Sequence, residues 1–263
     1  MTDSIQPQPI QPQPKPSRRP NPLSWFHRLR SNILLAPPFF LATGIFGTLA
    51  LIASLWDKSG RLQHRLARHW ARACIFWSGS RLQIIGIENL PAETAVFAAN
   101  HTSYMDTPVV FASLPFQFRI LAKAPLWKIP FIGWYLDRSG QVPIDQTSAR
   151  AGITSLARGA RTLQSGMPMV IFPEGGRAFN GQLQPMLAGA AWMAIKAQVP
   201  LVPLTLIGTY EMLPIHVYAL KPRPVKLIVG EPIDTTGMST RDAEALTDRL
   251  RAIIHDTYLA EHP

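Results

Sequence analysis

Residues 94–106 read TAVFAANHTSYMD, and residues 169–178 read MVIFPEGGRA. In each stretch a short apolar run ends in polar and charged residues. A short apolar run bounded by turn-forming residues is typical of a buried strand, and α/β folds carry their functional groups in the loops that follow such strands. These two stretches therefore predict an α/β fold with a functional site at one edge of a central sheet.

From about residue 81 onward, the chain alternates short apolar strands with helical segments. We expect strands at residues 82–86, 94–99, 118–122, 169–172, 201–207 and 225–229. We expect helices at residues 148–164, 189–198 and 239–258, the first capped by Thr147 or Ser148 and ended by Gly166. This alternation predicts a mixed, largely central β-sheet flanked by helices, and no internal repeat is evident.

The N-terminal part of the chain has a different composition. Residues 1–22 are rich in proline and glutamine and contain no aromatic residue, so they cannot bury enough apolar surface to offset the entropy of ordering. We therefore expect a disordered, basic, Pro-rich tail over residues 1–30. A membrane-docking region over 31–80 and a catalytic domain over 81–263 complete the predicted organisation.

The predicted docking region begins with the 24 uncharged residues 33–56, which are long enough to span a bilayer. Basic residues flank this run on both sides, whereas a simple crossing shows positive charge mainly on one side. We favour a helix that enters one leaflet and returns, with a full crossing left open. Residues 58–77 follow as a basic amphipathic helix suited to an anionic lipid surface, or else packed on the core with a solvated basic face.

The charge balance limits the class of partner. The chain has 26 Lys and Arg against 16 Asp and Glu, a net charge of +10, which indicates an anionic partner. The positive charge gathers around the apolar run rather than on an aromatic-studded sheet. We therefore expect an anionic membrane surface and no nucleic acid. The single cysteine, Cys74, excludes an internal disulfide and a multi-cysteine zinc site, and no metal site is indicated.

Three groups of residues carry candidate chemistry. His101 can accept a proton near neutral pH, and Asp106 could fix its tautomer if His101 lies in a turn and Asp106 in the first turn of the next helix. In the second stretch, Glu174 offers an acceptor and Arg177 a bidentate anion donor around two glycines, unless they form only a surface salt bridge. Arg119 and Lys123 end a strand and could face a phosphate, or could be ordinary solvated cations.

Taken in order, these residues resemble the glycerol-phosphate/lysophospholipid acyltransferase family, most closely its 1-acylglycerol-3-phosphate acyltransferases. The resemblance covers residues 82–229 and rests on four blocks in the family's order: NHTSYMD, RILAKAPLWKIPFIG, FPEGGRA and VPLVPLTLIG. It implies transfer of a fatty acyl group from acyl-CoA or acyl carrier protein to the free hydroxyl of 1-acylglycerol-3-phosphate, giving phosphatidic acid. It implies no cofactor beyond this acyl donor, and a catalytic domain at the cytoplasmic face of the cell (inner) membrane.

The resemblance also implies a role for each candidate residue. His101 would be the general base and Asp106 would orient it. The acceptor would be held by Glu174, Gly175 and Arg177, with Arg177 on its phosphate and further positive charge from Arg119 and Lys123. Because Cys74 lies away from the four blocks, no acyl-cysteine intermediate is indicated.

Departures from the family pattern concern the acceptor. Gly176 and Ala178 stand where the family has hydroxyl side chains, and Leu187 and Gln146 stand where it has cations. The loss of these groups keeps another lysophospholipid or a lyso-aminolipid open as acceptor. Hydrolysis in place of transfer, and a non-catalytic lipid-binding membrane protein, are the alternatives of other classes.

Overall fold

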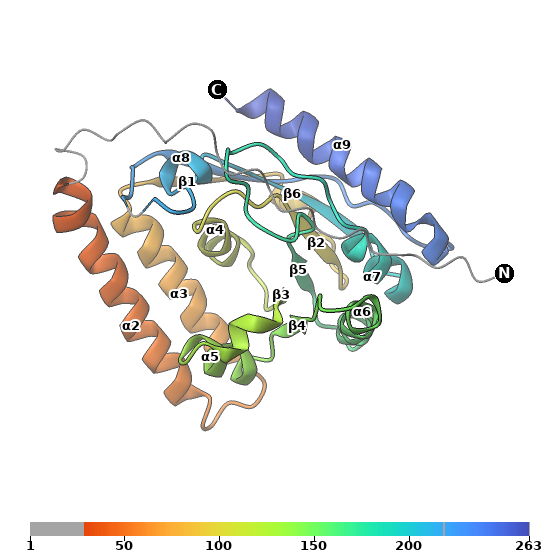
Figure 1. The fold of residues 1–263 in the computed structure, drawn as a ribbon, viewed down its shortest axis with the longest axis horizontal. Helices are drawn as coiled ribbons and strands as arrows, with labels where there is room; N and C mark the ends of the chain where they lie inside the picture. The colour runs from red at the N-terminus through yellow and green to blue at the C-terminus, as the bar shows by residue number, and fades with distance from the viewer. Residues whose placement is uncertain (1–28, 218, 263) are drawn as a thin grey trace.

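The computed structural model describes residues 29–217 and 219–262. Within them a seven-stranded sheet has the order β1-β7-β6-β2-β5-β3-β4, and its neighbouring strands are parallel except for the antiparallel pair β6–β7 (Figure 1). The predicted mixed α/β sheet is confirmed. The strands are β1 Arg81–Ile85, β2 Val96–Ala99, β3 Arg119–Lys123, β4 Val142–Ile144, β5 Met169–Ile171, β6 Leu201–Ile207 and β7 Pro224–Val229.

The helices between the strands include the three that the sequence predicts. Ser148 caps α6, because its hydroxyl accepts a hydrogen bond of 3.2 Å from the Ala151 amide, and Gly166 follows with a positive φ of 86°. The helices are α2 Ala36–Ala53, α3 Arg61–Trp77, α4 Asp106–Ser113, α5 Ile132–Arg138, α6 Ala149–Gln164, α7 Gly189–Ala197, α8 Thr209–Met212 and α9 Ala243–Glu261. Short 3-10 turns at Ile87–Asn89, Ala124–Lys128 and Thr240–Asp242 complete the set.

Two apolar cores cover the two faces of the sheet. Side chains alternate along a strand, so Phe97 of β2 packs into the core under α3 and α4, whereas Val96 and Ala98 pack into the core under α7 and α9. Figure 1 shows α3 and α4 on one side of the sheet and α6, α7 and α9 on the other. The result is a three-layer molecule, and the loops after β2, β3 and β5 meet at one edge of the sheet.

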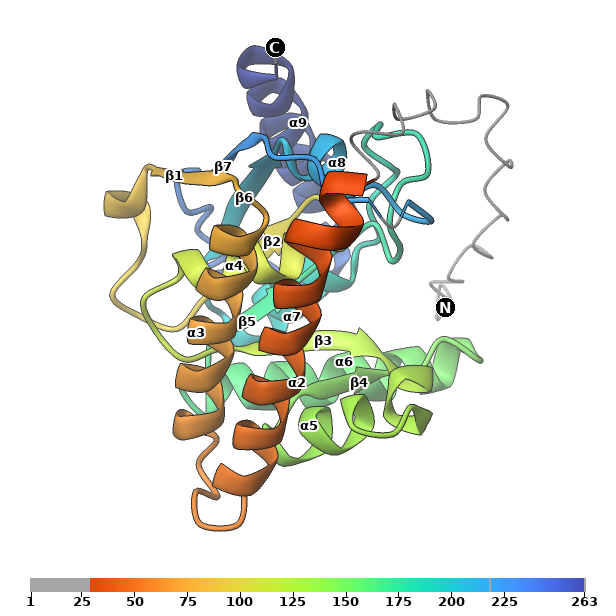
Figure 2. The same cartoon turned by 90° about the vertical axis from the view of Figure 1, so that its left-hand side faces the viewer.

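The N-terminal helices α2 and α3 form an antiparallel hairpin along one side of the molecule (Figure 2). Among the described residues one helix, Ser31–Ala53, is long and apolar enough to cross a membrane, and most of it is exposed. Pro37 and Pro38 fall in its first α-helical turns, after a π-helical turn at Ser31–Leu35. The helix continues through both prolines, because a proline in the first turn of a helix leaves no amide hydrogen bond unmade.

Helix α3 lies on the core, so the second interpretation of residues 58–77 is the one observed. It buries Ala71 and Cys74 in the same core as Phe97, and its outer face carries exposed arginines such as Arg65. The predicted division at residue 80 is therefore not a packing boundary, because α3 covers one face of the catalytic sheet. The predicted tail lies, over residues 1–28, outside the described residues.

Candidate active site

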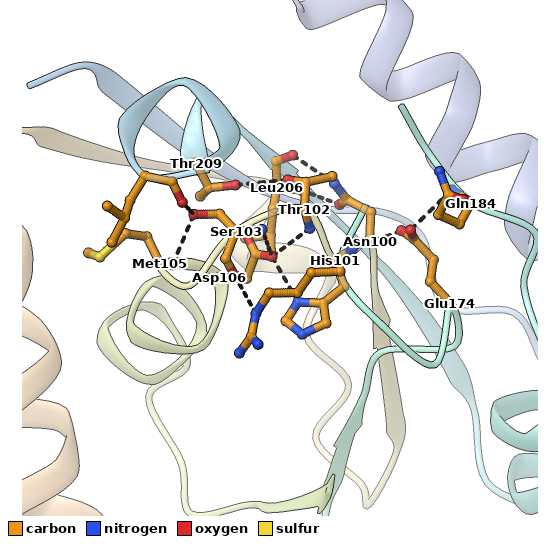
Figure 3. Close-up of polar contacts among 12 residues, drawn as sticks. Asn100, His101, Thr102, Ser103, Met105, Asp106, Glu174, Gln184, Leu206 and Thr209 are labelled. Carbon is orange, nitrogen blue, oxygen red and sulfur yellow. Dashed lines mark hydrogen bonds and ion pairs between the residues drawn. The ribbon is translucent and has the colours of Figure 1, made fainter. Parts of the chain in front are cut away.

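The loop that follows β2 brings His101 and Asp106 together. Asp106 is the first residue of α4, as the spacing predicts, and its Oδ2 lies 2.8 Å from His101 Nδ1 (Figure 3). The same oxygen accepts the backbone amides of Thr102 at 2.7 Å and Ser103 at 2.8 Å. A carboxylate acceptor at Nδ1 assigns the proton of the neutral imidazole to that nitrogen. The lone pair of Nε2 is then left to accept a proton.

Packing fixes the plane of the imidazole and lowers its basicity. The ring of Phe172, at the end of β5, stacks on His101 with centroids 4.0 Å apart and planes 20° apart. Burial lowers the pKa of His101, and the positive charges of Arg177 and Lys123 lower it further, while the hydrogen bond to Asp106 opposes them. The imidazole is therefore neutral at neutral pH, the form that a general base requires.

Asn100 ties this loop to the neighbouring strand. Its side chain is fully buried, donates to the carbonyl of Leu206 at 3.0 Å and accepts from the Leu206 amide at 2.7 Å. Ser103 fixes the turn that follows, because its hydroxyl donates to the Leu213 carbonyl at 2.7 Å. These positioning roles were not predicted. The signal available in the sequence was an asparagine placed directly after a buried strand.

Glu174 holds the histidine loop rather than facing a ligand. One carboxylate oxygen accepts the His101 amide at 2.8 Å and the other accepts the Gln184 amide at 3.0 Å (Figure 3). Burial raises the pKa of Glu174 to about 8 and outweighs the two amide donors, which lower it. The predicted contact with the acceptor is therefore corrected, because the carboxyl is buried and both oxygens are occupied.

The glycines after Glu174 let the chain turn closely around the site. Gly175 has a φ of +67°, and a Cβ on it would lie 3.2 Å from Leu187 Cδ1. A Cβ on Gly176 would lie 3.8 Å from the ammonium nitrogen of Lys123. Lys123, the last residue of β3, therefore reaches the glycine turn, and its predicted role toward the acceptor stays a prediction. Gln146 also approaches Gly175, with its amide nitrogen 3.8 Å from the same hypothetical Cβ.

Arg177 is held above the loop that carries His101. Its Nε donates to the carbonyl of Ser103 at 3.1 Å, and its guanidinium carbon lies 4.6 Å from the centre of the Tyr104 ring. Within the described part of the chain, no acceptor is found for its two terminal nitrogens, so they can take a bidentate anion. Tyr104 was not singled out in the sequence, although it lies between His101 and Asp106.

Arg119 is not part of this site, so its predicted role is wrong. It is the first residue of β3, and Lys123 is the last, so the two side chains start about 13 Å apart on an extended strand. Its Nη2 donates to the carbonyl of Ser59 at 2.9 Å, in the loop that joins α2 to α3. Arg119 therefore secures the N-terminal hairpin at the opposite end of the strand.

Comparison with known proteins now identifies the family. The Acyltransferase family model matches residues 81–207. A 1-acyl-sn-glycerol-3-phosphate acyltransferase of Chlamydomonas reinhardtii is 31% identical over 252 residues, covering 92% of this chain and 74% of the relative. The chain belongs to the acyltransferase family. The predicted resemblance to the 1-acylglycerol-3-phosphate acyltransferases is thereby confirmed.

Two further proteins are similar to this acyltransferase, one in sequence and the other in fold and sequence. The chloroplastic 1-acyl-sn-glycerol-3-phosphate acyltransferase of Arabidopsis thaliana is 33% identical over 207 residues, which cover 74% of this chain and 58% of that protein. The crystal structure of the 1-acyl-sn-glycerophosphate (LPA) acyltransferase PlsC from Thermotoga maritima superposes with a TM-score of 0.73 at 25% identity. That match covers 88% of this chain and 95% of the solved one. The chain thus spans a little over half of the Arabidopsis relative.

The acyltransferase site offers acid–base and anion-binding groups. Within residues 29–217 and 219–262, no group of three or more His, Cys, Asp or Glu side chains is placed to hold a metal ion. Cys74 lies on the inner face of α3 and is fully buried, and burial raises the pKa of its thiol to about 12, so it is not a nucleophile. The arrangement can deprotonate a hydroxyl at His101 Nε2 beside an anion bound at Arg177 and Lys123.

Proposed function

We propose that this acyltransferase transfers a fatty acyl group from an acyl thioester to the free hydroxyl of 1-acylglycerol-3-phosphate, giving phosphatidic acid. The observation that carries the proposal is the buried His101–Asp106 pair, with the open imidazole nitrogen set beside Arg177 and Lys123. A base next to two cations suits a hydroxyl nucleophile on a molecule that also bears a phosphate. The names of the relatives support the same substrate.

The reaction needs one proton transfer in each direction. His101 Nε2 takes the proton of the glycerol hydroxyl as the oxygen attacks the thioester carbonyl, and Asp106 stabilises the imidazolium that forms. The C–S bond then breaks, and the thiolate leaves with the proton from His101. No covalent enzyme intermediate is required, in agreement with the burial of Cys74.

The donor and the location belong to the same proposal. Acyl-CoA and acyl carrier protein both present a thioester, and either fits this chemistry without a further cofactor. The exposed apolar helix Ser31–Ala53 supports association with an anionic membrane, from which a lysophospholipid acceptor enters the site. We place the catalytic domain at the cytoplasmic face of the cell (inner) membrane, where soluble acyl thioesters are made.

An acyl-transfer assay tests the proposal. Purified protein would be supplied with labelled acyl-CoA or acyl carrier protein and a panel of lysolipids, with products identified by mass spectrometry. We expect phosphatidic acid from 1-acylglycerol-3-phosphate, and a His101→Ala variant slower by about two to four orders of magnitude. Free fatty acid as the main product would indicate a hydrolase. Preference for a lysolipid with a masked phosphate would show that the acceptor is another lysophospholipid. Near-normal turnover by His101→Ala would remove His101 from the mechanism.

A further inference from the structure

Residues 126–134 expose an apolar surface next to the active site. The five consecutive residues 128–132 are all exposed. Phe131 is 67% exposed and Trp134 54% exposed, and their rings pack edge to face with centroids 5.0 Å apart. The other large apolar side chains exposed in this segment are Leu126, Ile129 and Ile132. A cluster of this kind on a folded domain is typical of a contact surface.

The backbone holds this segment in a defined shape. Phe131 has a positive φ of 62°, a conformation that strains a bulky residue and persists only where the surroundings fix it. The next turn closes through the Gly133 amide, which donates to the Ile129 carbonyl at 2.7 Å. Gly133 is needed there, because a Cβ on it would collide with the backbone of Trp127. The chain thus accepts strain to keep the Phe131 ring exposed.

Two structural connections place the segment between the site and the apolar helix. It begins three residues after Lys123, whose ammonium group reaches the glycine turn of the site. At its other end α5 lies beside the C-terminal end of α2, where Arg138 donates to the Ser54 hydroxyl at 3.1 Å (Figures 1 and 2). The end of α2 is itself apolar and exposed, with Trp56 exposed by 74%.

Charge decides which partner this surface fits. Five cations lie on residues 123–138, which include the segment, and on residues 57–61 at the adjoining end of the α2–α3 hairpin: Lys123, Lys128, Arg138, Lys58 and Arg61. The same stretches hold two acids, Asp57 and Asp137, and the carboxylate of Asp57 already accepts the amides of Ser59 and Leu62. Exposed aromatic rings on a segment with cations on either side of it in the chain suit the headgroup region of an anionic bilayer.

We propose that residues 126–134 form a second membrane contact, separate in sequence from the helix Ser31–Ala53, that seats Phe131 and Trp134 in the headgroup boundary of an anionic bilayer. The contact holds the Lys123 side of the active site against the lipid surface, so that a lipid acceptor passes from bilayer to site without crossing water. The inference rests on the proposed function only in supposing a lipid acceptor. The membrane contact itself is measurable without turnover.

A fluorophore attached at residue 131 tests this contact directly. Because Cys74 is fully buried, a thiol introduced by Phe131→Cys in the full-length protein can be labelled selectively with an environment-sensitive fluorophore. We expect a blue shift, and quenching by brominated lipids, when vesicles of phosphatidylcholine and phosphatidylglycerol are added. Ile153→Cys, on α6 and 53% exposed, is the matched control and should show neither change. A label at residue 131 that stays in water on vesicle-bound protein overturns the proposal.

A second variant separates lipid contact from chemistry. Phe131→Ser combined with Trp134→Ser should lower turnover of a long-chain acceptor in vesicles by about tenfold, because two aromatic anchors are lost. Turnover of a short-chain, water-soluble acceptor should stay unchanged, which also shows that the variant is folded. Equal loss on both acceptors overturns the proposal. Without vesicles, fluorescence changes at residue 131 that depend on protein concentration would overturn the proposal and assign the surface to a contact with a second copy of the chain. Absence of all acyl transfer by the unaltered protein would contradict only the proposed function.

Discussion

At the scale of single residues, the site depends on how each charged group is bound. Asp106 gathers three donors on one oxygen, which fixes both the carboxylate and the imidazole against it. Glu174 accepts two backbone amides in a similar way, and so joins the loop of His101 to the segment that begins at Gln184. Arg177 is anchored through one nitrogen and leaves its terminal nitrogens to a ligand.

The pH profile should report His101. The imidazole must be neutral to act as a base, so kcat/KM should fall as the pH drops through its pKa, and burial places that pKa below the ordinary value of 6.5. Asp106→Asn removes the group that raises the pKa, so the acid limb should move further down. The rate should also fall by about two to four orders of magnitude. Rates measured from pH 4 to 8 on both proteins check this, and an unmoved limb would contradict it.

Arg177 should control acceptor binding. Arg177→Lys keeps the charge but loses the planar fork, so the acceptor KM should rise about tenfold while the donor KM barely moves. Arg119→Lys is the matched control. It should lower the melting temperature, because the contact with Ser59 is weakened, and leave the acceptor KM unchanged. Equal rises in both KM values for Arg177→Lys would mean that Arg177 supports the fold.

Glu174→Gln should test the positioning role. A glutamine can accept through only one oxygen, so either the buried amide of His101 or the partly buried amide of Gln184 loses its partner, at a cost of about 1–3 kcal/mol. We expect lower stability in urea unfolding at pH 6. The folded pKa of Glu174 is raised to about 8 from 4.5, so its favourable contribution is full below pH 4.5 and lost as the pH rises toward 8. The difference in the free energy of unfolding between the wild-type protein and Glu174→Gln should therefore shrink toward pH 8. A difference that stays constant with pH would contradict the raised pKa.

At the scale of elements, the loop between β5 and α7 is held by two tyrosines from distant helices. The hydroxyl of Tyr210, on α8, donates to the Phe179 carbonyl at 3.2 Å, and that of Tyr258, on α9, donates to the Gly181 carbonyl at 3.3 Å. Because Arg177 lies in this loop, the C-terminal helix contributes to where the anion donor lies.

Gly181→Ala should disturb that loop. Gly181 has a φ of +75°, and a Cβ on it would lie 2.7 Å from the Tyr210 ring, so the alanine must push the ring or the loop aside. We expect a several-fold rise in acceptor KM together with lower stability. Gly237→Ala is the matched control, since Gly237 also has a φ of +75° but open space around it. It should cost about 1 kcal/mol of stability and leave the KM alone. Similar KM values for both variants would contradict the loop's role.

At the scale of the whole molecule, the hairpin of α2 and α3 has two functions. Helix α2 presents apolar side chains outward, such as Phe40 and Leu41, while α3 covers the core that contains Phe97. Natural domains are stable by only about 5–15 kcal/mol. Uncovering one face of the sheet therefore removes a contribution comparable to the whole margin.

A chain that begins at Arg81 should not fold. It lacks α3 and exposes the core face of β2 and β7, so we expect aggregation, or a circular dichroism spectrum without cooperative thermal unfolding. A chain that lacks only residues 1–22 is the control, and it should unfold and bind membranes like the intact protein. A soluble, cooperatively unfolding chain from residue 81 would show that α3 is dispensable.

Features of this protein that depend on local spacing are predictable from the amino-acid sequence. The apolar run of β2 and the five-residue step from His101 to Asp106 depend only on backbone geometry over a few residues, and both are observed as predicted. The same holds for α6 and its cap at Ser148. Strand β4 was missed because three residues with a central proline carry no alternating pattern.

Contacts between segments that are distant in the chain follow only from the three-dimensional fold. Glu174 meets the His101 amide only because β2 and β5 are neighbours in the sheet, 73 residues apart in the chain. Of the two cations on β3, strand direction sends Lys123 to the site and Arg119 to the hairpin. An amphipathic pattern such as that of α3 is the same whether the apolar stripe faces lipid or protein. The folded sheet shows that this stripe faces protein, because α3 packs on the apolar face of the sheet.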